Sequence, residues 1–182
     1  MFRSIMYSLV ILVCYNANAQ NSTGRFTEKV WRVNILNPAI ELEVPTGKSA
    51  TFSTAFGIGY GGAYPDLSGG GDGLIYSINP FLDVQYKLYY NFNKRLRKQK
   101  NIDNNSGNFL SARVLARGPS LVENVVRSTD YDFAIGPTWG LQRKYGKNFH
   151  LLFDIGPIYY FDTEGRGNIF PIMIQLNLGF DL

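Results

Sequence analysis

The sequence predicts an all-β chain, an eight-stranded antiparallel transmembrane up-and-down β-barrel. Three features predict it: several segments alternate apolar with small or polar residues, a short apolar segment opens the chain, and an apolar alternation closes it. The closing segment has apolar residues at every second position: Phe170, Ile172, Ile174, Leu176, Leu178, Phe180 and Leu182. In outer-membrane barrels such a row contacts lipid, while the opposite row faces the lumen.

The N-terminal segment has the pattern of a secretory signal. Arg3 precedes the apolar stretch Ile5 to Val13, and the small residues Ala17-Asn18-Ala19 predict cleavage near Ala19. We therefore expect a signal peptide at residues 1–19 and one barrel domain at residues 20–182. No stretch approaches the roughly 20 apolar residues of a transmembrane helix. The expected location is the cell outer membrane, reached by export through the inner membrane.

Cys14 is the only cysteine, and it lies within the predicted signal peptide. The mature chain would then have no thiol, which excludes disulfides and thiol redox chemistry. Lipidation of Cys14 is the competing interpretation. It is disfavoured because Val13 stands where a small residue is expected before a lipidated cysteine.

Three segments show the alternation of a half-buried strand most clearly: Ala50 to Gly61, Ile75 to Tyr90 and Tyr131 to Leu141. Two less regular segments are Asn108 to Arg117 and Phe149 to Phe161. We expect their large apolar rows to face outward: Phe52, Phe56, Ile58 and Tyr60; Tyr76, Ile78, Leu82, Val84, Tyr86 and Leu88; Tyr131, Phe133, Ile135, Trp139 and Leu141. The aromatic residues near strand ends, Tyr89 and Tyr90 among them, predict interfacial girdles.

The start of the barrel allows two interpretations. A strand at Ala39 to Val44 requires a preceding strand within Thr27 to Leu36, and the outward parity changes at Asn37-Pro38. A tight turn there gives eight strands, which the even strand number of bacterial barrels favours. A bulge at Asn37-Pro38 would instead give seven long segments.

Prolines and connections complete the expected layout. Pro80, Pro137 and Pro157 fall within strand patterns and predict local bulges, because proline removes a ladder donor. Tight turns are expected at Pro45 to Ser49 and Arg143 to Lys147. They would lie on the periplasmic side, together with a long basic turn at Asn93 to Gly107. Looser external loops are expected at Gly62 to Gly73, Gly118 to Asp130 and Asp162 to Asn168.

The inward rows carry charges of both signs, which predicts a paired ionic core. They are Arg32, Glu41, Glu43, Asp83, Lys87, Arg113, Arg117, Asp132, His150, Asp154 and Asp181. An eight-stranded barrel is just wide enough for its own side chains. We therefore expect a side-chain-filled lumen rather than a channel.

His150, the only histidine, is the one candidate for catalysis, because Asp154 lies four residues along the same face. No serine nucleophile is evident beside it, so a histidine satisfied in a polar lumen is the favoured interpretation. Gly69-Gly70-Gly71-Asp72-Gly73 lacks the lysine and the helix of a phosphate-binding loop. Asp66 and Asp72 lack calcium-ligand spacing. No catalytic, cofactor-binding or metal residue is assigned.

The net charge of +4 comes largely from one run: Lys94, Arg95, Arg97, Lys98 and Lys100. Such a run is usually solvated, though it could contact anionic lipid or a periplasmic polymer. Nucleic acid is excluded as a partner because only Phe92 lies close enough to stack on bases. The expected partners are outer-membrane lipid and, at the external loops, protein or glycan.

Short motifs along the chain are similar to those of a family of small, functionally uncharacterised outer-membrane β-barrel proteins of Gram-negative bacteria. The motifs are Val33-Asn34-Ile35-Leu36-Asn37-Pro38, Ile78-Asn79-Pro80 with Tyr86 and Tyr89-Tyr90, Ile155-Gly156-Pro157 with Tyr159, and Leu178-Gly179-Phe180. The resemblance extends over nearly the whole mature chain. It implies an outer-membrane barrel and supplies no catalytic residues.

Three functional hypotheses follow. The first is a non-enzymatic outer-membrane barrel that acts as an envelope structural component or through its external loops. The second is a lipid-modifying barrel enzyme. The third is a soluble lipocalin-like barrel, which would place Phe52, Phe56 and Ile58 inside, against an apolar ligand. The row of glycine and serine opposite them would make a poor soluble exterior, which favours the membrane.

Overall fold

The computed structural model describes residues 24–61, 77–123 and 129–182. The predicted signal peptide at 1–19 and Cys14 lie outside these residues, as do Tyr76, Asp66, Asp72 and the glycine-rich segment Gly69 to Gly73. The strands are β1 (Val30–Asn34), β2 (Ala39–Pro45), β3 (Ala50–Gly61), β4 (Ser77–Tyr89), β5 (Asn108–Arg117), β6 (Val122–Glu123), β7 (Asp132–Tyr145), β8 (Phe149–Asp162) and β9 (Gly167–Asp181).

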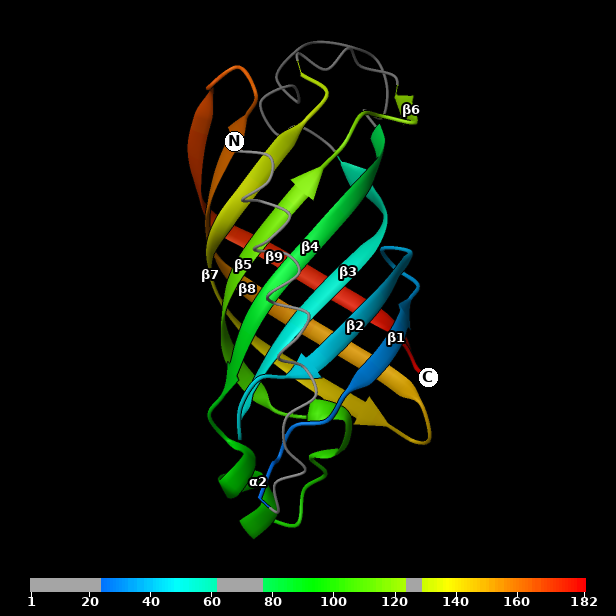
Figure 1. Cartoon of the computed structure of the whole chain (residues 1–182), viewed down its shortest axis with the longest axis vertical. Helices are drawn as coiled ribbons and strands as arrows, with labels where there is room; N and C mark the ends of the chain where they lie inside the picture. The colour runs from blue at the N-terminus through cyan, green and yellow to red at the C-terminus, as the bar shows by residue number, and fades with distance from the viewer. Residues whose placement is uncertain (1–23, 62–76, 124–128) are drawn as a thin grey trace, which may run out of the picture.

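Eight of these strands form a closed antiparallel ring. The order around it is β3-β2-β1-β9-β8-β7-β5-β4, and β4 pairs back with β3. The two-residue strand β6 lies outside the ring and pairs only with the start of β4. Figure 1 shows the tilted strands wrapping around one long axis. The eight-stranded prediction is confirmed within the described residues.

The interpretation with seven segments is wrong. β1 and β2 are separate strands, paired antiparallel from Val30 with Glu43 to Asn34 with Ala39. The tight turn between them brings β3 very close, because the Ile58 N–H donates to the Pro38 carbonyl at 2.8 Å. A Cβ on Gly57 would lie 2.1 Å from that same oxygen, so only glycine fits there.

The predicted bulges at the three prolines are confirmed at one of them. The register between β8 and β9 shifts between Gly156 and Ile158, around Pro157. Pro80 stands in an unbroken register opposite Ile58, and Pro137 opposite Ala112. The Pro80 carbonyl still accepts a hydrogen bond from the Gly118 N–H at 2.9 Å. On the other side of Pro137, the β7–β8 pairing skips residues 136–138 and resumes in the same register.

The two faces of the sheet are distributed as the alternation predicts. Phe56 is 65% exposed and Tyr60 is 69% exposed, whereas Ser53 and Ala55, on the other face of the same strand, are buried. The last strand follows the same rule, with Ile172, Ile174 and Leu176 exposed on the outside. The outer face is apolar and the inner face is polar and charged.

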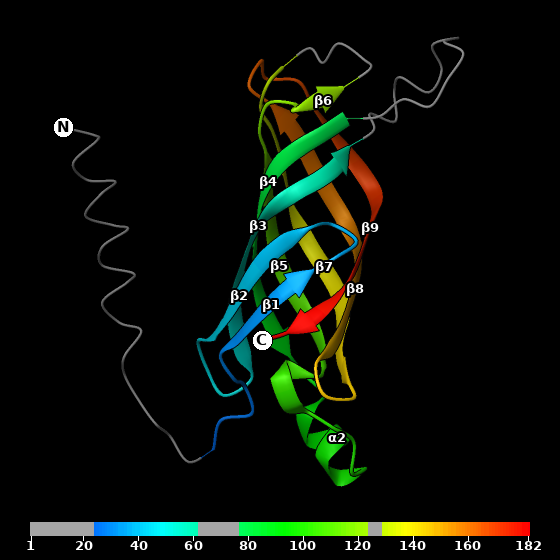
Figure 2. The ribbon, with the colours of Figure 1, turned by 90° about the vertical axis from the view of Figure 1, so that its right-hand side faces the viewer.

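One end of the ring carries a helix that the all-β prediction missed. α2 (Phe92–Arg97) and a 3-10 turn (Asp103–Asn105) lie in the segment between β4 and β5. This is the end where β1 begins and β9 finishes, and Figure 2 shows α2 beyond the strands. No helix in the described part of the chain is long and apolar enough to cross a membrane.

The connection between β8 and β9 is also tighter than predicted. Only four residues separate Asp162 from Gly167. The Asp162 carboxylate accepts hydrogen bonds from the backbone N–H groups of Glu164 and Arg166 at 2.9 and 3.0 Å, which fixes the turn. The expectation of a loose loop there is wrong, because an aspartate placed this way organises a turn.

Candidate functional site: the charged interior

The part of the interior nearest α2, here called the lower part, is organised around Arg32, which is fully buried on β1. Its Nε donates to Asp181 Oδ1 at 2.9 Å, and its Nη1 donates to Glu41 Oε1 at 3.1 Å and to Glu43. Its Nη2 donates to the Asn104 carbonyl at 3.0 Å. One guanidinium therefore joins three carboxylates and the segment that follows α2.

Lys87 on β4 is the second cation of this lower cluster. Its Nζ lies 3.4 Å from Glu41 Oε1 and 3.6 Å from Glu43 Oε2, and it donates to Gln142 Oε1 at 3.1 Å. Thr51 and Tyr89 donate hydroxyl hydrogen bonds to Glu43 Oε1 at 2.6 and 2.8 Å. The buried carboxylates are thus matched by cations and by hydrogen-bond donors, as buried charges require.

A second cluster lies further along the axis and is built on Arg113 from β5. Arg113 and Asp83 form a two-point pair, Nε to Oδ1 at 2.9 Å and Nη2 to Oδ2 at 2.7 Å. Arg113 Nη1 also lies 3.6 Å from Asp154 Oδ1. Gln85 and Gln175 complete the cluster, because Gln85 donates to Asp154 and Gln175 donates to Asp83.

The paired ionic core predicted from the inward rows is confirmed. Ten of the eleven predicted inward residues are buried, and the exception is Arg117, whose side chain is 34% exposed. Arg117 lies 3.9 Å from Asp132, near the opposite end of the ring from α2. Ser77, Asn79 and Ser120 form a hydrogen-bonded group close to it.

His150 does not form the predicted unit with Asp154. Its Nδ1 lies 3.6 Å from Asp181 Oδ1, while Asp154 faces Gln85 and Arg113 instead. Neither ring nitrogen has a hydrogen-bond partner in the described part of the chain, and the side chain is fully buried. The contact between nucleophile and base that acyl-transfer chemistry needs is missing at this histidine.

One small space lies inside the described part of the ring. The space between the two clusters, lined by Glu41, Asp83, Lys87 and Gln175 among others, is about 10 Å³. That is about the size of one water molecule, whereas ligand pockets typically measure several hundred Å³. The inward side chains therefore leave no ligand-sized space between the two clusters.

An aromatic plug closes the lumen at the α2 end, and sequence reasoning missed it. Tyr89, predicted for a girdle, is only 4% exposed and stacks on Phe92 at 4.8 Å. Phe109 meets Tyr89 edge-on, and Leu152 completes the cluster. The alternation along β4 could have revealed the burial of Tyr89, because Tyr89 lies on the same inward face as Lys87 and Gln85. Phe92 carries this packing into α2.

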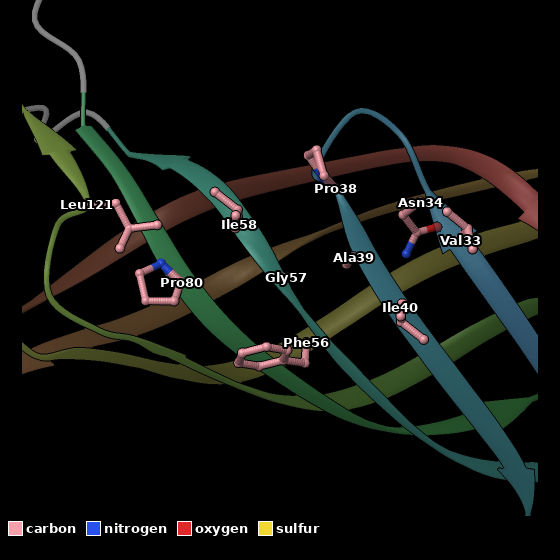
Figure 3. Close-up of a pocket in the computed structure, with 10 residues that line it drawn as sticks. All are labelled: Val33, Asn34, Pro38, Ala39, Ile40, Phe56, Gly57, Ile58, Pro80 and Leu121. Atoms are coloured by element: carbon pink, nitrogen blue, oxygen red, sulfur yellow. The ribbon is translucent and has the colours of Figure 1, made fainter.

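On the outside of β1 to β4 lies an open apolar groove of about 530 Å³ (Figure 3). Its lining includes Ile40, Phe56, Ile58, Pro80 and Leu121. The groove is apolar like the rest of the outer face. Its lining residues form no polar cluster that could orient a small molecule.

The interior provides no evident cofactor or metal site. No group of three or more histidine, cysteine, aspartate or glutamate side chains is placed to hold a metal ion in ranges 24–61, 77–123 and 129–182. Comparison with known proteins found no matching family model, no matching curated protein and no matching solved structure.

Proposed function

We propose that this chain is a small outer-membrane β-barrel protein with a side-chain-filled lumen. It has no enzymatic activity and acts as a structural component of the envelope or through its external loops. One observation carries the proposal: large apolar side chains cover the outside of a closed ring whose inside holds the charged residues. A soluble domain has the opposite distribution, whereas a membrane barrel needs this one.

The aromatic residues support a bilayer around the ring. Tyr60, Tyr131 and Tyr159 are exposed near the end opposite α2, and Tyr90 and Tyr145 are exposed near the α2 end. Trp139 donates its indole N–H to the Tyr90 hydroxyl at 2.8 Å, so both polar groups are satisfied at the outer surface. Two such belts are typical of the membrane–water interfaces of a barrel.

The closed ring supports the same proposal through the backbone. Hydrocarbon offers no hydrogen-bond partner to a peptide group, so a sheet that spans it must close on itself. β1 and β9 close this sheet through Arg32 with Asp181, Val33 with Phe180 and Asn34 with Gly179. In a bilayer, acyl chains would fill the open groove over β1 to β4.

The proposal includes an orientation, in which the predicted signal peptide exports the chain and the C-terminus lies in the periplasm. With the C-terminus in the periplasm, α2 and the turns after β2 and β7 are periplasmic, and the connections at the other end form the external surface. Protein or glycan partners at that surface, and membership of the outer-membrane barrel family suggested by the short motifs, are parts of this proposal.

The alternative functions have less support. A lipid-modifying enzyme needs an accessible base with a hydroxyl partner, and His150 is fully buried without one. We therefore expect His150→Ala to leave the lipid A profile of the cell unchanged. A lipocalin-like protein needs an apolar cavity, but Phe52, Phe56 and Ile58 lie on the exposed face.

Gel mobility of the protein from purified outer membranes, with and without boiling, tests the proposal. A closed barrel that resists detergent until heated gives two bands of different mobility in that fraction. A protein recovered from the soluble fraction with one mobility would overturn the proposal.

A further inference from the structure

The basic run seen in the sequence is part of a larger charged surface at the α2 end of the ring. Eleven of the 18 lysine and arginine residues gather there: Arg25, Lys29, Lys48, Lys94, Arg95, Arg97, Lys98, Lys100, Arg143, Lys144 and Lys147. All but Arg95, Arg143 and Lys144 are exposed. We call these eleven residues the basic end. Glu28 and Asp103 are the exposed carboxylates among them in the described chain.

The opposite end of the ring has a different charge balance. Its described cations, Arg117 and Arg166, both lie within 4 Å of carboxylates. At the basic end, by contrast, no lysine or arginine forms an ion pair with any residue that the structure describes. The cations with described ion pairs are Arg32, Lys87, Arg113, Arg117 and Arg166. Among the cations that the structure describes, those without an ion pair are thus concentrated at one end.

The segment that carries most of this charge is held against the barrel. Asn104 Nδ2 donates to Asp181 Oδ2 at 2.8 Å, and the Asn104 carbonyl accepts from Arg32 and Gln142. Asn105 exchanges two hydrogen bonds with the backbone of Glu28. Together with the packing of Phe92, these contacts hold both ends of the charged segment against the barrel.

The basic end faces along the axis of the ring rather than sideways. Figures 1 and 2 show α2 extending past the ends of the strands, while a bilayer would surround the strands themselves. A partner for this surface therefore comes from the aqueous compartment beyond it. Seven of the eleven cations are lysines, and they lie on the segment before β1, on three connections and at the end of β7. This arrangement suits many weak contacts with a polyanion rather than one anion in a pocket.

We propose that the basic end binds the cell wall through the carboxylates of its peptide stems. This inference rests on the proposed function, because the α2 end is periplasmic only if the ring is an outer-membrane barrel. Peptidoglycan is a polymer with many free carboxylates on the periplasmic side, so multiple weak ion pairs add up to useful avidity. Such binding weakens as salt screens the exposed charges.

The test is co-sedimentation of the full-length mature protein, in neutral detergent, with purified peptidoglycan sacculi. We expect the protein to pellet with sacculi at low salt and to be released at high salt. The variant Lys94→Gln/Arg97→Gln/Lys98→Gln/Lys100→Gln should bind about tenfold more weakly, as expected for losing four exposed ion pairs. All four residues are exposed and support no described contact with the barrel, so the fold should survive.

Two controls complete the experiment. Asn93→Ala, on the same helix, and Arg117→Gln/Arg166→Gln, at the opposite end, should pellet like the natural chain. Equal pelleting of the fourfold variant would overturn the proposal, and so would binding to phosphatidylglycerol vesicles without binding to sacculi. The heat-dependent mobility of the natural chain in outer membranes tests the barrel separately, because it does not depend on the basic end.

Discussion

Arg32 Nε lies 2.9 Å from Asp181 Oδ1, and the two residues are direct partners across the junction of the first and last ring strands. This junction has only three residue pairs, whereas the β8–β9 ladder runs almost the length of both strands. The ion pair therefore lies where the ring has the fewest backbone bonds. Closure of the barrel and the charge network of its interior depend on the same guanidinium.

Arg32→Gln should strongly destabilise the ring. It would leave Asp181, Glu41 and Glu43 with Lys87 as their main remaining cation, and breaking a buried ion pair costs about 3–5 kcal/mol. Urea unfolding in detergent, followed by the fluorescence of Trp31 and Trp139, measures the change. Arg97→Gln, on the exposed surface of α2, should change the unfolding free energy by about 0.5 kcal/mol or less. A small loss for Arg32→Gln would contradict this account of closure.

Arg113 and Asp83 should give unequal losses when either partner is removed. Arg113→Gln leaves two buried carboxylates, Asp83 and Asp154, without their cation, whereas Asp83→Asn leaves Arg113 beside Asp154 at 3.6 Å. We expect Arg113→Gln to cost about 3–5 kcal/mol and Asp83→Asn to cost clearly less. The same urea titration compares them. Equal losses would show that Asp154 does not compensate for the missing partner.

The strand pattern predicted most of the ring because side-chain parity is a local property. Alternation places Phe56 outward and Ser53 inward wherever a strand forms, and an even strand count then favours closure at eight. The same rule predicts which residues belong to the ionic core. It does not predict which of them pair, because Arg32 and Asp181 are 149 positions apart and their contact depends on the register between strands.

The parts that sequence reasoning missed depend on contacts between segments. The position of Tyr89 at a strand end predicts a girdle residue, but the inward parity of β4 continues to that position. α2 is six residues long, too short to show helical periodicity. Its position is set by Phe92, which packs on the barrel's aromatic plug, and local sequence cannot reveal that packing.

Phe92→Ala should free the α2 segment from the barrel. Phe92 is buried against Tyr89 and Phe109, whereas Leu96 on the same helix is 45% exposed. Trypsin should then cleave faster after the basic residues between positions 94 and 100, because cleavage needs local unfolding of the backbone. Limited digestion with mass spectrometry of the fragments measures this. Leu96→Ala is the matched control and should be cut at the natural rate, and equal rates for both variants would refute the anchoring role of Phe92.

Gly140→Ala should destabilise the plug by overpacking. A Cβ at Gly140 would lie 2.4 Å from Phe109 Cζ and 2.8 Å from Asp154 Cβ. Forcing an extra methyl into a filled core costs about 1–3 kcal/mol. Urea unfolding should detect the loss, while Gly47→Ala, whose new Cβ would lie 3.5 Å from Ala50 Cβ, should have little effect. A neutral Gly140→Ala would mean that the interior can rearrange more freely than the close packing implies.

Val114→Arg distinguishes a membrane barrel from a soluble one. Val114 is 42% exposed on the outer face, and its ring neighbours Val84 and Ile135 are apolar as well. An arginine on the lipid face near the bilayer midplane costs about 2–4 kcal/mol, because its charge must leave water. At an exposed site of a soluble protein the same substitution usually changes stability by about 0.5 kcal/mol or less.

Folding into lipid vesicles, titrated with urea, measures the difference, and Asn93→Arg on α2 serves as the control for an added charge. A loss confined to Val114→Arg supports lipid contact at β5, whereas equal stability of both variants would place that face in water and reverse the proposed environment of the ring.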